Sequence, residues 1–118
     1  MEWKHFVLIG FGGGLGSAFR AYVAHVLRGG FPWWTFLVNV AGCFLIGFLM
    51  RELDEERIGL RFFLVTGFCG GFTTFSAFGS ETMELLRAGE FGAGLGNVAL
   101  TLACCLAAVA AGHELAKG

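Results

Sequence analysis

The sequence predicts an all-α membrane protein with four transmembrane helices. Three observations lead to this prediction: an apolar composition, long gaps between charges, and no strand-like alternation. The residue types A, V, I, L, M, F, W, Y and C make up 56% of the chain and charged residues only 14%, whereas about a quarter of a typical soluble domain is charged. With 118 residues, the chain has room for one domain, which we place at residues 1–118.

The gaps between charges have the length of membrane spans. Asp, Glu, Lys and Arg are all absent from residues 29–50, 62–80 and 91–112. Each gap is about as long as a helix that crosses a hydrocarbon core ~30 Å thick. Backbone groups in lipid must be paired inside helices or closed barrels, and strand patterns are absent. Together with the apolar N-terminal segment, this predicts helices at about residues 3–27, 33–50, 62–86 and 91–115.

Several classes of function are disfavoured by the same composition. The net charge is −1 and no basic patch is present, which argues against a nucleic-acid partner. The four cysteines lie inside apolar segments and form no C-x-x-C pair, so we interpret them as small buried residues rather than redox or metal groups. No hydrolytic or redox constellation is visible, and an enzyme is not predicted.

The first helix is rich in glycine. Gly10 with Gly14, and Gly12 with Gly16, form small-xxx-small pairs, which let a second helix backbone approach closely in a membrane. A charge inside this segment is costly, so Arg20 is expected to face protein or water. Two interpretations remain open for it: a place in an aqueous vestibule, or a side chain that extends to the nearby interface.

The second helix follows a turn at residues 29–32, and Trp33 and Trp34 are typical of the aromatic belt at the membrane surface. Asn39 lies well inside this uncharged segment, where a buried amide must find partners. It serves either a helix–helix hydrogen bond or a pore. The charged stretch at residues 51–61 is predicted to be a solvated loop.

The third helix contains adjacent glycines followed by adjacent threonines, a poor pattern for a continuous helix. We expect a break near residues 70–74, at mid-membrane. Backbone that is unwound at this depth must be buried in protein or line a cavity, and broken helices commonly mark ion sites. Phe75 and Phe78 share one helix face; they serve packing, or they present their positive ring edges to an anion.

The fourth helix carries a further small-xxx-small pair, Gly92 with Gly96, and places Thr101 and Cys105 on one face. The distribution of positive charge gives only a weak orientation bias, even counting Lys117 with the N-terminal side, and a weak bias permits insertion both ways. Four short helices do not enclose a water-lined route alone, so an oligomer is expected. Dual insertion would allow an antiparallel dimer, equivalent to the inverted repeats of larger transporters.

Three stretches of this sequence resemble the Fluc (CrcB) family of fluoride ion channels. The most specific is the run from Gly67 to Phe78, GFCGGFTTFSAF; the stretches at residues 13–20 and 35–42 agree with it. The resemblance covers nearly the whole chain, with all four spans in order. It implies a passive, fluoride-selective channel in the cell inner (plasma) membrane that exports cytoplasmic fluoride as an antiparallel, dual-topology homodimer.

The resemblance also implies roles for individual residues. A structural sodium ion is expected at the dimer centre, held by the backbone carbonyls of Gly70 and Thr73 from each subunit. Arg20 is expected in the vestibule. Departures from the family pattern are Cys43 for an expected serine, Ala77 for a common threonine, and Cys105 for a frequent hydroxyl. The predicted fluoride pathway comprises Asn39, Phe75, Phe78, Ser76, Thr101 and Cys105.

The main alternative is a small, dual-topology, proton-coupled transporter of cations or drugs. Such proteins share the size and the four helices, but they require a membrane-embedded acid in the first helix. Residues 4–27 contain no Asp or Glu and carry Arg20 instead, which favours the channel.

Overall fold

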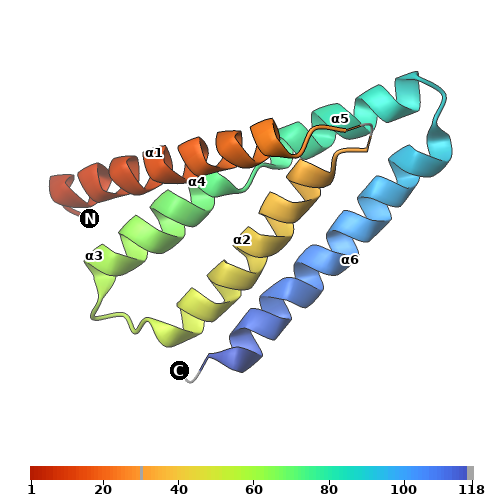
Figure 1. The fold of residues 1–118 in the computed structure, drawn as a ribbon. Coiled ribbons are helices and arrows are strands. Elements are labelled where there is room, and N and C mark those ends of the chain that lie inside the picture. Colours follow the sequence, from red (N-terminus) through yellow and green to blue (C-terminus); the bar gives the residue numbers. More distant parts are fainter. Residues whose placement is uncertain (30, 117–118) are drawn as a thin grey trace.

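The computed structural model describes residues 1–29 and 31–116, and all regular elements in this part of the chain are helical (Figure 1). Four helices are long and apolar enough to cross a membrane: Trp3–Val26, Trp33–Glu52, Ile58–Arg87 and Phe91–Leu115. The all-α prediction with four such helices is therefore confirmed. Gly30, in the predicted turn, and Lys117, counted in the charge balance, lie outside the described residues.

Three of the spans are continuous helices: α1 (Trp3–Val26), α2 (Trp33–Glu52) and α6 (Phe91–Leu115). The charged connection after α2 is shorter than the sequence suggested, because α2 continues to Glu52 and the next helix begins at Ile58. The remaining span has four parts: α3 (Ile58–Arg61), the π-helical segment η1 (Phe62–Cys69), α4 (Gly70–Phe72) and α5 (Phe75–Arg87).

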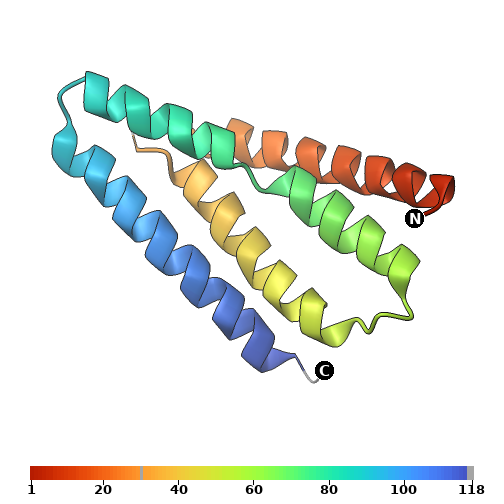
Figure 2. The ribbon, with the colours of Figure 1, turned by 180° about the vertical axis from the view of Figure 1, so that it is seen from behind.

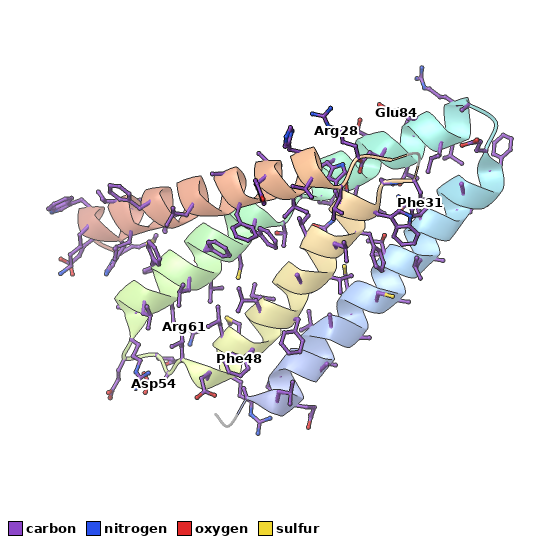
Figure 3. The ribbon with its side chains drawn as sticks, viewed as in Figure 1. Arg28, Phe31, Phe48, Asp54, Arg61 and Glu84 are labelled. Atoms are coloured by element: carbon purple, nitrogen blue, oxygen red, sulfur yellow. The ribbon has the colours of Figure 1, made fainter. Side chains whose placement is uncertain are left out.

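The helices lie side by side in two pairs, α1 with η1 and α4, and α2 with α6 (Figures 1 and 2). Both partners of each pair run in the same direction. The two chain ends and the α2–α3 connection lie at one end of the bundle (Figure 1). Charged side chains mark the ends: Asp54 and Arg61 lie at this end, and Arg28 and Glu84 at the opposite one (Figure 3).

Glycines bring the helix backbones into contact within each pair. A β-carbon at Gly12 or Gly16 would overlap the carbonyl oxygens of Phe63 and Phe68. In the second pair, a β-carbon at Gly47 would overlap the Val109 carbonyl, and a β-carbon at Gly112 would overlap the Phe44 carbonyl. Close backbone approach at small residues is the main packing device available to helices in lipid.

Two residues interrupt the third span. Thr73 has ψ 157°, and Thr74 has φ −149° and ψ 107°, so both are extended. Gly70 and Gly71 stay helical, and Gly71 packs against the backbone of Gly13 in α1. The interruption thus falls on the threonines at the C-terminal edge of the 70–74 segment.

Candidate functional site

Asn39 of α2 pairs with the backbone of Thr74 in two directions. Its Nδ2 donates to the Thr74 carbonyl oxygen over 3.1 Å, and its Oδ1 accepts the Thr74 N–H over 2.8 Å. Both residues are buried. The amide thus supplies the donor and the acceptor that the extended residue would otherwise lack in an apolar interior. The hydrogen-bonding partner expected for Asn39 is therefore the interrupted backbone itself.

Thr74 also starts the next helix with its side chain. Its Oγ1 accepts the N–H of Ala77 over 3.1 Å and caps α5. In a continuous helix, the Thr74 N–H would donate to the Gly70 carbonyl and the Ala77 N–H to the Thr73 carbonyl. Both N–H groups are bound elsewhere. The Gly70 and Thr73 carbonyls thereby lose their helical donors.

A cavity of about 400 Å³ lies beside the interruption. Side chains of α2, η1, α5 and α6 line it, and most of the wall is apolar. The predicted site residues that line it are Asn39, Gly70, Thr73, Phe75, Phe78, Thr101 and Cys105. The fold therefore gathers residues of α2, of α6 and of the interrupted span around one space at the break.

Phe75 and Phe78 differ in their surroundings although they share a helix face. Their ring centroids are 5.6 Å apart and the rings are tilted by 47°. The side chain of Phe78 is only 7% exposed, whereas that of Phe75 is 79% exposed in the single chain. Phe78 is thus part of the interior, and Phe75 projects from it.

Two predicted site residues lie outside the cavity wall. Ser76 points toward Thr74, with 3.3 Å between the two hydroxyl oxygens. Arg20 lies on the α1 side, where its Nε donates to the Gly71 carbonyl over 3.1 Å, and Ser17 Oγ approaches the same oxygen at 3.4 Å. Arg20 therefore bonds the backbone just before the interruption, a partner that the sequence did not suggest.

A chain of polar side chains continues from the cavity between α5 and α6. Thr101 Oγ1 donates to Asn97 Oδ1 over 3.3 Å, Asn97 Nδ2 donates to Thr82 Oγ1 over 3.0 Å, and Thr82 Oγ1 donates to the Phe78 carbonyl over 2.8 Å. The sequence analysis overlooked Asn97 and Thr82. The signal was available, because Asn97 and Thr101 are four residues apart on one helix face.

A second polar contact joins α2 to α5, where Thr35 Oγ1 donates to the Glu81 carboxylate. Thr35 is buried and lies one turn before Asn39. Among the described residues, no group of three or more His, Cys, Asp or Glu side chains could hold a metal ion. The polar groups at this site are amides, hydroxyls, thiols and backbone carbonyls.

A protein-family model and several known relatives match this chain. The family model described as CrcB-like protein, Camphor Resistance (CrcB), matches residues 7–113. This chain belongs to the CrcB family. Its members are ion channels rather than enzymes, in agreement with the prediction from the sequence.

Individual relatives carry a more specific name, fluoride-specific ion channel FluC. The relative from Rhizobium johnstonii is 43% identical over 114 residues, which cover 90% of each chain. That from Methylocella silvestris is 45% identical, covering 89% of this chain and 87% of its own. That from Elusimicrobium minutum is 43% identical, covering 97% and 94%. The similarity thus includes all four spans and the interrupted segment.

Proposed function

We propose that this protein is a passive, fluoride-selective ion channel, through which cytoplasmic fluoride leaves the cell across its inner membrane. The relatives named as fluoride-specific channels support the choice of ion. The observation that carries the proposal is the pairing of Asn39 with Thr74 beside the cavity. This pairing stabilises a non-helical segment inside a membrane span. In membrane proteins, non-helical backbone at this depth commonly lines an ion pathway.

The groups around the cavity suit fluoride. This anion is small and strongly hydrated, so a pore must replace its water with donors. Asn39 Nδ2 carries two hydrogens, and the bond to Thr74 uses one of them. The Thr101 hydroxyl is held by a long bond of 3.3 Å, which costs little to exchange. The edges of Phe75 and Phe78 add partial positive charge.

The route needs sites that release the ion as readily as they bind it. None of the residues that line the cavity is Lys or Arg, so fluoride meets no fixed positive charge that would trap it. We assign the pathway to Asn39, Phe75, Phe78, Thr101 and Cys105, with Ser76 reached through Thr74. Arg20, in α1, belongs to the entrance.

A structural sodium ion fits the carbonyls released at the break. The Gly70 and Thr73 oxygens lose their helical donors to the rearrangement around Thr74, and carbonyl oxygens suit a hard cation. Space is also available, because a β-carbon at Gly70 would meet no atom within 4 Å. One chain supplies two such oxygens, so a second copy would complete the ligand set. When bound, the ion supplies fixed positive potential at the break.

An antiparallel, dual-topology homodimer fits the unused helix surfaces. Gly12 and Gly16 pack inside the chain, but β-carbons at Gly10 and Gly14 would meet nothing within 4 Å. The pair Gly92 and Gly96 of α6 is equally open. These small-xxx-small surfaces are available to the backbone of a second copy, and the exposed ring of Phe75 would gain a partner there.

The direction of transport follows from weak-acid chemistry. Neutral HF crosses the membrane and ionises in the cytoplasm, which traps fluoride inside. An inside-negative potential then drives the anion outward through a passive pore. No energy source within the protein is required.

Fluoride efflux from liposomes tests the proposal. Purified protein is reconstituted into vesicles loaded with potassium fluoride, and release is recorded with a fluoride electrode after a potassium ionophore is added. We expect fast, ionophore-dependent release of fluoride, and none of chloride in matched vesicles. Release that follows a proton gradient instead would favour the coupled transporter. No release from folded protein would overturn the proposal.

A further inference from the structure

The cavity holds three of the four cysteines in this chain. Cys43, Cys69 and Cys105 line it, and Cys104 does not. All four are free thiols. Cys43 and Cys105 stand where the resemblance led us to expect hydroxyl residues, so they are features of this chain rather than of the family pattern. Their chemistry is different from that of a hydroxyl, because sulfur is a soft ligand.

Cys43 and Cys105 face each other across α2 and α6. The two helices run in the same direction (Figures 1 and 2), and one turn further along each of them Gly47 meets Val109 with no room for a β-carbon. This backbone contact brings the two cysteine positions to the same level. Both side chains line the same cavity from these positions.

Two sulfur atoms, and no more, are available to an ion at this point. No group of three His, Cys, Asp or Glu side chains within residues 1–29 and 31–116 could hold a metal, so Cys69 does not complete a triad. Zinc requires four ligands in a tetrahedron, and the pair does not provide them. Soft cations that bind two thiolates in a line need nothing further.

The apolar wall around the two cysteines favours a cation whose charge makes the complex neutral. Ile46, Val65 and Leu102 form apolar parts of the wall, and a net charge is costly in such surroundings. A monovalent cation between two thiolates leaves one negative charge. A divalent cation gives a neutral complex, so a divalent soft ion is favoured.

We propose that Cys43 and Cys105 form a two-thiolate binding site for a soft divalent cation of the Hg²⁺ type, and that its occupation blocks the pathway. Binding breaks both S–H bonds, forms two Hg–S bonds and releases two protons to water; no group is oxidised or reduced. The blocking effect rests on the proposed function, because the pair lines the same cavity as Asn39 and Thr101. The binding itself does not.

Binding is measured first, without any transport assay. The variant Cys69→Ser/Cys104→Ser keeps only the facing pair and is reduced, freed of reductant under argon and mixed with one equivalent of HgCl2. Native mass spectrometry is expected to show one Hg²⁺ per chain, and both thiols should resist a maleimide. Adding Cys43→Ser or Cys105→Ser to this variant leaves a single thiol. A monothiol competitor should remove Hg²⁺ from such a single-thiol variant at a concentration at least roughly tenfold lower than from the pair, because the pair holds its second thiolate at high effective concentration.

Fluoride efflux gives the second readout, with each variant normalised to its own rate before metal. Loss of efflux is expected in the wild type and in Cys104→Ser, and it should be absent in Cys43→Ser and Cys105→Ser. Equal retention of Hg²⁺ by either single-thiol variant, or free reaction of both thiols with maleimide, would overturn the site. If the pair binds Hg²⁺ tightly but efflux is undiminished, the binding site stands and the proposal that its occupation blocks the pathway is wrong. If the protein binds Hg²⁺ at the pair but releases no fluoride even without metal, the binding site stands and the proposed channel function is wrong.

Discussion

Both helix pairs pack through glycines, but the glycine contacts extend along one pair and along only part of the other. Between α1 and the third span, glycines press backbone on backbone along the contact, from Gly12 to Gly71. Between α2 and α6, Gly47 and Gly112 are the only glycines among the described residues that do so, and Asn39 and Thr101 of these two helices line the cavity. One pair is packed backbone on backbone along its contact, and the other borders the cavity.

The largest expected effect comes from filling the rigid contact. Gly12→Val would drive its side chain into the backbone at Phe63, and backbone cannot move aside as a flexible side chain can. Overpacking costs about 1–3 kcal/mol or more, so we expect most of the folded protein to be lost. Size-exclusion chromatography and thermal unfolding in detergent measure this.

Gly14→Val is the matched control on the same helix. A β-carbon there meets nothing within 4 Å of its own chain, so the fold should survive while the proposed dimer dissociates. Equal loss of folded protein in both variants would show that the difference between the two glycine faces has no structural meaning.

The next effect is expected where the two helix pairs meet, at Asn39. Asn39→Ala leaves the Thr74 N–H and carbonyl without their partner, at about 1–3 kcal/mol for each buried group. Fluoride efflux should fall roughly tenfold or more, since 1.4 kcal/mol of barrier is tenfold in rate. Asn39→Asp keeps an acceptor for the Thr74 N–H, yet it should also block efflux by repelling the anion. Wild-type rates in both variants would remove Asn39 from the pathway.

Substitutions at Phe75 and Phe78 should distinguish an effect on fluoride transport from an effect on stability. Phe75→Ile changes a ring that is exposed in the single chain, whereas Phe78→Ile alters a buried one and should cost about 1 kcal/mol. The unfolding temperature should therefore fall less in Phe75→Ile than in Phe78→Ile. Efflux should fall sharply in both, because each loses a ring edge that the proposed pathway uses to meet fluoride. Unchanged efflux in both, with dimers intact, would contradict a route lined by phenylalanine.

The smallest effect is expected at Ser76. Its hydroxyl approaches Thr74 rather than the cavity, so Ser76→Ala should reduce efflux less than Asn39→Ala does. The same electrode assay, with the two variants reconstituted at equal density, decides the order. A greater loss in the serine variant would place the route closer to Ser76 than the cavity lies.

The sequence was sufficient for the number and type of the helices, because lipid leaves few alternatives to an apolar chain. It was also sufficient for the family, through the run from Gly67 to Phe78. It did not predict the π-helical geometry of residues 62–69, since propensity does not distinguish it from an α-helix. Nor did it predict that Arg20 bonds Gly71 or that Thr35 bonds Glu81, because these contacts depend on the rotation of packed helices.

The exchange of partners at Thr74 has a consequence for how this chain can vary. One residue takes the Asn39 oxygen with its N–H and the Ala77 N–H with its hydroxyl. A change at position 39 would therefore disturb the proposed anion pathway and, at the same time, the carbonyls to which the proposal assigns the sodium ion. Neither defect can be repaired locally. We expect substitutions at position 39 to be rare among descendants of this sequence, and position 74 to keep a side chain that can cap the Ala77 N–H.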